Sequence, residues 1–186
     1  MIELLLDQLK ETNEKNGIVF GDLILEEIGR MIQDSCRAFT DRTKGKAVAF
    51  RLDGDEFVLW VENQTKEQAA EFTKKLLGKI SAGFGRETFR VDVYAGLVRG
   101  EEGQSAELLI RRAKLARTFI NPGEDERYLF YEDIPEEKRR TPPPLQGREI
   151  NSLDYGEDVN LVSVALNLFG KGVDFRAQMM LMIRKI

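Results

Sequence analysis

The chain has 186 residues, of which 42% are apolar and 32% charged, with a net charge of −4. This composition is typical of a globular protein, and no apolar run approaches the ~18 residues of a membrane-spanning helix. Charges of both signs are interspersed without a basic stripe, which argues against nucleic acid as a partner. The absence of histidine excludes Ser-His triads and histidine-ligated zinc, and the single cysteine, Cys36, excludes an internal disulfide. We therefore expect a cytoplasmic protein whose chemistry rests on carboxylates, lysines, arginines and backbone groups.

The first half of the chain predicts a strand, a helix and a β-hairpin. The opening run MIELLLD predicts a strand, and its abrupt start suggests that the chain begins inside a larger protein. A helix is expected over GDLILEEIGRMIQDSCR, with Asp22 as its N-cap. Its apolar face consists of Ile24, Leu25, Ile28, Met31 and Ile32. The runs AVAFRL and EFVLWVE predict two strands joined at Asp53-Gly54, a dipeptide that suits a type I′ turn.

The second half repeats this alternation. Thr65 is the expected N-cap of the helix TKEQAAEFTKKLLGKI. The strand TFRVDVYAGLV follows, with inward positions at Phe89, Val91, Val93 and Ala95. Ser105 begins the helix SAELLIRRAKLARTF, and RYLFYE predicts a last short strand. The order β-α-β-β-α-β-α-β predicts an α+β fold with a ferredoxin-like core, in which helices cover one face of an antiparallel sheet.

The composition changes after this series. We assign residues 1–133 to the folded domain and residues 134–158 to a linker, in which three consecutive prolines favour an extended spacer. Residues 159–186 predict two helices separated at Gly170-Lys171-Gly172. They are too short to bury their own apolar faces, so we expect them to dock on another chain or domain.

The hairpin RLDGDEFVLW brings three acidic residues to one turn. Asp53, Asp55 and Glu56 can hold Mg²⁺, which takes one or two carboxylates and leaves its other positions to water and phosphate oxygens. A charged turn that merely faces water is the commoner explanation. The turn alone does not decide between the two.

The wider sequence context resembles a known family. RLDGDEF resembles the signature of GGDEF domains, the catalytic domains of diguanylate cyclases, and DQLKETNEKNGIVFGD keeps the spacing of that family's Asp-x-Phe-Lys-x-x-Asn and Gly-Asp motifs. AELLIRRAKLA and RYLFYE are similar to its last helix and strand. The resemblance implies a nucleotidyl-cyclase fold that condenses two GTP molecules into cyclic di-GMP, with Mg²⁺ as cofactor and two domains meeting face to face.

The resemblance also implies roles for individual residues. Asn13 and Asp22 occupy the positions at which the family recognises guanine, and Lys10 occupies the position of a lysine that faces the phosphates. Gly54 belongs to the nucleotide-binding turn, while Asp55 and Glu56 stand at the catalytic and metal-binding acidic pair of the signature. GTP or a related guanine nucleotide is therefore the implied ligand.

The phosphate end departs from the family pattern. Leu5 stands where the first aspartate of the family binds the metal, across from Asp55, and offers no side-chain oxygen. Asn121 occupies the position at which the family has a lysine that binds the triphosphate, and acidic residues follow it. Losing two or three such contacts would slow catalysis by a factor on the order of 10⁴ or more. The family's inhibitory product site falls on Lys44 and Ala47, so no standard product inhibition is expected.

Three functions remain open from the sequence. The first is a degenerate GGDEF domain that acts as a regulatory, GTP-sensing or interaction module in cyclic di-GMP signalling. The second is an active diguanylate cyclase with a rearranged metal site. The third is a structural dimerisation module, either as a homodimer or docked on other domains of a larger chain; Asn160 to Ile186 also resembles, faintly, the opening helix of a GAF sensory domain.

Overall fold

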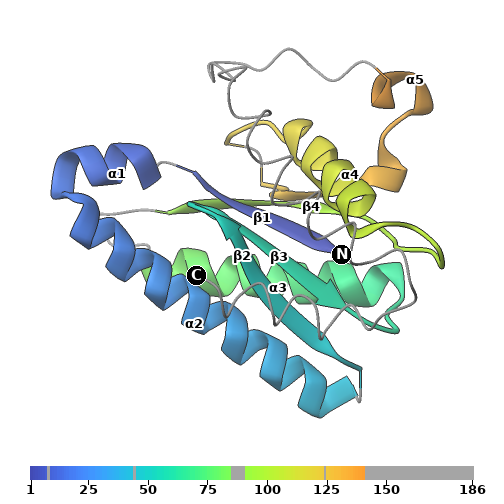
Figure 1. Cartoon of the computed structure of the whole chain (residues 1–186), viewed down its shortest axis with the longest axis horizontal. Coiled ribbons are helices and arrows are strands. Elements are labelled where there is room, and N and C mark those ends of the chain that lie inside the picture. Colours follow the sequence, from blue (N-terminus) through green and yellow to red (C-terminus); the bar gives the residue numbers. More distant parts are fainter. Residues whose placement is uncertain (8, 44, 85–90, 124, 141–186) are drawn as a thin grey trace. The chain divides into compact units, whose positions relative to one another are not determined.

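A computed structural model describes residues 1–140 except residues 8, 44, 85–90 and 124. The described residues all lie in one compact unit, Met1–Pro143. The elements of this unit, in chain order, are β1 (Ile2–Asp7), α1 (Leu9–Asn16), α2 (Ile18–Thr43), β2 (Ala47–Asp53), β3 (Glu56–Val61), α3 (Lys66–Phe84), β4 (Asp92–Leu97), α4 (Ala106–Thr118), β5 (Tyr128–Phe130), a 3-10 turn (Tyr131–Asp133) and α5 (Glu136–Arg139) (Figure 1).

The strands form one five-stranded sheet in the order β2-β3-β1-β4-β5. Strand β1 lies between β3 and β4 and is antiparallel to both, while β4 and β5 are parallel. The first four strands therefore have the ferredoxin-like arrangement that the sequence predicts, and the α+β fold class is confirmed.

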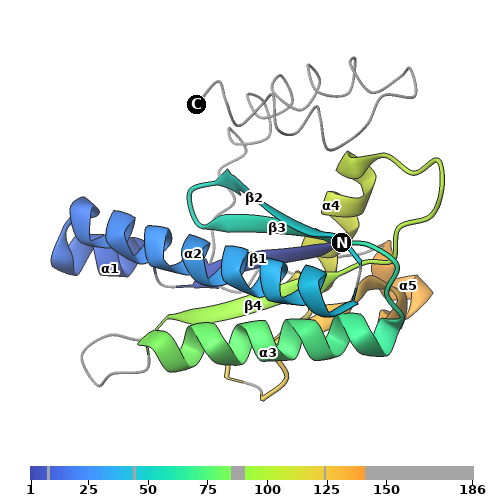
Figure 2. The same ribbon diagram turned by 90° about the horizontal axis from the view of Figure 1, so that it is seen from below.

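Alternation along β1 places its side chains on two faces of the sheet. Ile2, Leu4 and Leu6 belong to the main core, which they share with apolar side chains of α2 and α3. Glu3 faces the other side, where it contacts Arg117 of α4. Helix α4 thus covers the face opposite α2 and α3 (Figure 2), so the expectation that the helices cover one face is wrong.

The region between β1 and β2 differs from the prediction. Helix α1 was not predicted, because LKETNEKN has a single apolar residue and only Thr12 becomes buried. Gly17, with φ of +87°, donates its N–H to the carbonyl of Asn13 at 2.8 Å and ends α1 in the left-handed conformation that suits glycine. Helix α2 then begins at Ile18, so the expectation that Asp22 is an N-cap is wrong.

The β2–β3 hairpin is present, but its turn is displaced by one residue. Asp53 pairs with Glu56, and a register shift lies between Arg51 and Asp53, so Gly54 and Asp55 are the central residues. Gly54 has φ of +20°, and the one described non-glycine residue with positive φ is Asn63. A type I′ turn needs positive φ at both central positions, so that expectation is wrong. The Arg51 guanidinium donates to the Gly54 carbonyl at 2.9 and 2.6 Å and braces the turn.

The other local predictions agree more closely with the structure. Thr65 and Gln68 exchange hydrogen bonds between side chain and backbone N–H, which is a capping box, and the Ser105 hydroxyl accepts from the N–H of Leu108. Val91, Val93 and Ala95 are buried, and Phe89 lies outside the described residues. The predicted apolar face of α2 is buried at four of its five positions, and Met31 packs partly buried against the core.

The predicted linker and the C-terminal helices lie largely outside the described residues. Within the described part, Ile134 is 3% exposed, and α5 follows it. Arg139 stacks 4.8 Å from the ring centroid of Tyr131 and donates to the carbonyl of Ile134. The folded unit therefore extends past residue 133. A search of the described helices finds none with the length and hydrophobicity needed to span a bilayer.

Candidate functional site

Helix α4 lies directly against the sheet at Gly96. A Cβ on Gly96 would lie 1.8 Å from the carbonyl oxygen of Ala113, a distance that no side chain can occupy. Ala113 and Ala116, the small residues of the contacting helix face, are both fully buried. This close approach brings Lys114 and Arg117, three positions apart on α4, over the face of β1 and β3.

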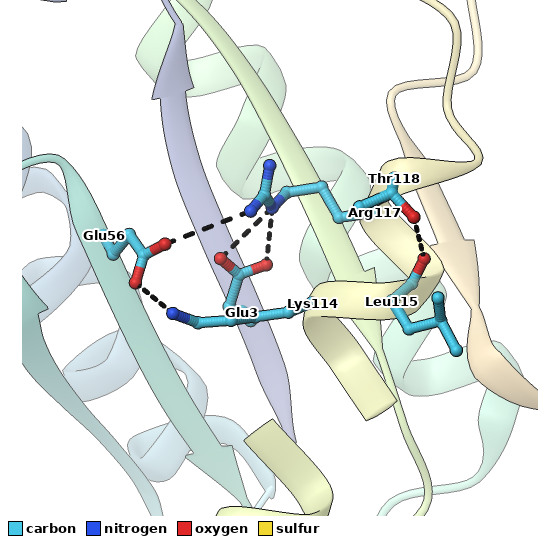
Figure 3. A network of polar contacts seen from close by, with 6 residues as sticks. All are labelled: Glu3, Glu56, Lys114, Leu115, Arg117 and Thr118. Atoms are coloured by element: carbon cyan, nitrogen blue, oxygen red, sulfur yellow. Dashed lines mark hydrogen bonds and ion pairs between the residues drawn. The ribbon is translucent and has the colours of Figure 1, made fainter. Parts of the chain in front are cut away.

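The two cations of α4 form ion pairs with one glutamate from each strand (Figure 3). Lys114 Nζ lies 2.5 Å from Glu56 Oε2. Arg117 Nε donates to both carboxylate oxygens of Glu3, at 3.2 and 2.8 Å, and Arg117 Nη2 lies 4.0 Å from Glu56 Oε1. We call Glu3, Glu56, Lys114 and Arg117 the four-charge network.

Glu3 is the most deeply buried member of this network. Its side chain is 0% exposed and that of Arg117 is 16% exposed. Burial raises the pKa of the Glu3 carboxyl, and the nearby Glu56 raises it further, while the charge and hydrogen bond of Arg117 lower it. The pKa of Glu3 therefore stays above its usual value, because burial outweighs the opposing effect of Arg117.

The register of β1 and β3 places Leu5 beside this network. Leu5 pairs with Glu56, not with Asp55 as the sequence analysis placed it, and its side chain is 5% exposed. Asp55 contributes its backbone instead, because its carbonyl accepts from the N–H of Leu6 at 3.1 Å. The half-buried Glu56 side chain is thus flanked by a leucine and two cations.

The residues present do not fit a magnesium ion of the family type. Mg²⁺ requires oxygen ligands in near-octahedral geometry, and Leu5 supplies none from its side chain. The Glu56 carboxylate is already paired with Lys114 and faces Arg117, whose positive charges would repel a divalent cation. Within the described ranges, no cluster of three or more acidic, cysteine or histidine residues is arranged to hold a metal.

The residues expected to bind guanine come from α1 and α2. Gly21 packs on Asn13 so closely that a Cβ there would lie 1.8 Å from Asn13 Oδ1. That oxygen is buried and has no hydrogen-bond partner in the described protein. Asp22 and Lys10 are both exposed, Asp22 directly after Gly21 and Lys10 one turn before Asn13. The structure therefore supplies an unsatisfied acceptor, an exposed carboxylate and an exposed lysine along two adjoining helices.

Two other expected site residues lie outside the helices. Gly54 is exposed at the hairpin turn, and Asn121 is exposed beyond the end of α4. A shallow pocket of about 320 Å³ lies between α3 and β5, and it is lined by Lys66, Tyr128 and Asp133 among others. None of the residues predicted to bind nucleotide lines this pocket, so it is a separate feature.

Sequence reasoning missed three members of the four-charge network. Glu3 is an isolated acid within an apolar strand, and such a residue needs a buried cation as partner. Lys114 and Arg117 have the spacing of one helix face, which was a usable signal. Their pairing with β1 and β3 depends on the contact at Gly96, which spacing alone does not reveal.

Comparisons with known proteins agree with this fold. A family model described as "Diguanylate cyclase, GGDEF domain" matches residues 1–118. The chain is similar to diguanylate cyclase DgcS of Shewanella oneidensis, with 33% identity over 113 residues, which are 61% of this chain and 36% of that protein. It is also similar to the bifunctional diguanylate cyclase/cyclic di-GMP phosphodiesterase MucR of Pseudomonas aeruginosa, with 30% identity over 130 residues, or 68% of this chain and 18% of that protein.

A solved structure extends the likeness to three dimensions. The GGDEF domain of DgcB from Caulobacter crescentus, in complex with c-di-GMP, matches with a TM-score of 0.58 at 18% identity, over 70% of this chain and 76% of that one. This likeness shows the fold alone. The chain spans 36% and 18% of the two curated relatives, so it corresponds to one part of such proteins. Because the family model covers residues 1–118 of 186, the chain belongs to the GGDEF domain family of diguanylate cyclases.

Proposed function

We propose that this chain is a catalytically impaired GGDEF domain that binds a guanine nucleotide and acts as a regulatory or interaction module in cyclic di-GMP signalling. The single observation that carries this proposal is the state of Glu56, the glutamate of the family signature. Its carboxylate is paired with Lys114 and lies opposite Leu5, so it is engaged by protein charges where catalysis would use a metal. A cytoplasmic location is part of the same proposal.

Retention of guanine binding is supported by the α1–α2 contact. Asn13 Oδ1 is a buried acceptor without a protein partner, and leaving such an atom unsatisfied costs about 1 to 3 kcal/mol. A guanine base carries N–H donors on its Watson–Crick edge that can satisfy an amide oxygen and a carboxylate together. Asn13 and Asp22 offer that pair, and Lys10 offers a cation for the phosphates.

The test of impaired catalysis is product formation. The full chain is incubated with GTP and either Mg²⁺ or Mn²⁺, and the mixture is analysed by mass spectrometry. The proposal predicts no cyclic di-GMP above that of a protein-free control. Cyclic di-GMP that accumulates in proportion to protein concentration would refute it.

An active diguanylate cyclase is the second candidate, because Asp55 and Glu56 keep their places at the hairpin. The two curated relatives are themselves named as cyclases. Should the chain form product, the variant Glu56→Ala decides whether this site is responsible. A cyclase working through Glu56 would lose its product, whereas unchanged product would assign the activity to a contaminant or another site.

An interaction role is supported by exposed apolar side chains at the start of α2. Ile18, Val19 and Leu23 are 71%, 75% and 58% exposed. Neighbouring apolar side chains of this size on a surface are typical of contact sites. We propose that the domain forms a homodimer or docks on other domains of a longer chain. Sedimentation of the chain over a range of concentrations, with and without residues 145–186, tests this proposal. A monomer in both cases would refute it.

A further inference from the structure

We infer that the groove between α3 and β5 is a docking site for an extended, basic peptide segment of a partner protein, which adds as a strand to the free edge of β5. The groove has a volume of about 320 Å³, and its lining includes Lys66, Glu67, Glu126, Tyr128, Phe130 and Asp133. We call it the α3–β5 groove. The inference goes beyond the proposed function, because it depends neither on nucleotide binding nor on catalysis.

The first argument is the backbone of β5. Among the described strands β5 is the last of the sheet, and it pairs on one edge only, in parallel with β4. The N–H of Ala95 donates to the carbonyl of Arg127 at 2.9 Å, so the backbone groups of Arg127 and Leu129 point toward β4. Those of Tyr128 and Phe130 therefore point outward, at the free edge. Their two N–H donors and two carbonyl acceptors have the spacing that an added strand requires.

The second argument is the space beside this edge. Tyr128 and Phe130 alternate with Leu129 along β5, and both rings lie on the side of the main core, with their centroids 6.4 Å apart in an edge-to-face arrangement. Ala70 of α3 belongs to the opposite wall, and its small side chain leaves room in the groove. Every second side chain of an added strand would therefore enter a space between two aromatic rings and a helix.

The third argument is charge, which selects the partner. Among the described residues that line the groove, Glu67, Glu126 and Asp133 are acidic and Lys66 is basic. The Lys66 ammonium forms an ion pair with Asp133 and lies 5.0 Å from the ring centroid of Phe130. The lining thus carries two more negative charges than positive ones. A lysine or arginine of the added strand is attracted by this excess, and an acidic residue is repelled.

The inference is tested by fluorescence anisotropy with the full chain and a labelled peptide of four Lys-Val units, in which valine favours a strand and lysine supplies the charge. The peptide is expected to bind. The same peptide with methylated backbone nitrogens keeps its charges but cannot pair with a strand edge, and it should bind at least about tenfold more weakly. Glu126→Gln should weaken binding about threefold. The matched control is Glu71→Gln, an exposed acid of α3 outside the groove, which should leave binding unchanged.

Hydrogen exchange followed by nuclear magnetic resonance locates the bound peptide. The amides of Tyr128 and Phe130 should exchange more slowly when the peptide is bound, because they then donate to its carbonyls. The inference is overturned if the peptide does not bind, if these two amides exchange at unchanged rates, or if the methylated peptide binds equally well. Equal binding of a Glu-Val peptide of the same length would overturn the basic character of the partner. Formation of cyclic di-GMP by the chain would refute the proposed function and leave this inference standing.

Discussion

Arg117 holds the fully buried carboxylate of Glu3 with two hydrogen bonds from its Nε, at 3.2 and 2.8 Å. Removing the arginine leaves the buried Glu3 carboxyl without its ion-pair and hydrogen-bond partner. We therefore expect Arg117→Met to lower the free energy of unfolding by about 3 to 5 kcal/mol. Urea denaturation at neutral pH measures this loss.

The double variant Glu3→Leu/Arg117→Met is the control for that prediction. It removes both charges and replaces them with apolar groups of similar size, which is often neutral or stabilising for a buried pair. We expect it to recover most of the stability lost in Arg117→Met. If the double variant is as unstable as the single one, packing by the arginine, and not pairing with Glu3, explains the loss.

Gly96 is predicted to be the position least tolerant of a larger residue in the sheet. The Cβ of Gly96→Ala would meet a backbone oxygen of α4 and push the helix away, which costs about 1 to 3 kcal/mol or more. Thermal unfolding measures the change. Gly78→Ala is the matched control, since no atom lies within 4 Å of its added Cβ on an exposed face of α3. An unchanged midpoint in Gly96→Ala would contradict the close contact.

Gly21 is predicted to matter for ligand binding more than for stability. The added Cβ of Gly21→Ala meets only the end of the Asn13 side chain, which can rotate away, so the fold should survive. The amide would then leave the place where it is proposed to meet guanine, and affinity for GTP should fall at least about tenfold. Calorimetry of GTP binding to Gly21→Ala and Gly78→Ala measures the difference. Equal affinities would remove Asn13 from the proposed site.

The Cys36 thiol is predicted to be unreactive in the folded protein. It lies in the core on α2, 4% exposed, and burial raises the pKa of its thiol from 9.0 to about 11. Because the folded-state pKa is the higher one, the neutral thiol favours folding fully below pH 9, and this contribution is lost as the pH rises through about 11. Alkylation at pH 8 should be slow until denaturant is added. Rapid alkylation of the native chain would show that α2 opens.

The sequence was sufficient for the elements with a strong local signal. Apolar and β-rich runs identified β1 and β3, alternation identified β4, and capping residues identified the starts of α3 and α4. Helix α1 was not predicted because its residues are polar and its formation depends on Gly17 and on packing against α2. The hairpin turn was misplaced because a register shift in β2, set by pairing with β3, moved the central residues by one.

The candidate site was less accessible to sequence reasoning. A motif comparison located Leu5, Asp55 and Glu56, but it could not show that Leu5 faces Glu56 or which groups neutralise that glutamate. Lys114 and Arg117 lie more than a hundred residues from β1 in the chain and meet it only through tertiary packing. Long-range ion pairs of this kind have no local pattern.

The most direct test of the whole account is calorimetry of GTP binding to the full chain, once with excess Mg²⁺ and once with a chelator. A domain that reads guanine through Asn13 and Asp22, and in which Leu5 replaces a metal ligand, should bind GTP with the same affinity in both conditions. Binding that requires Mg²⁺ would contradict the account, because a metal would then still be part of the site.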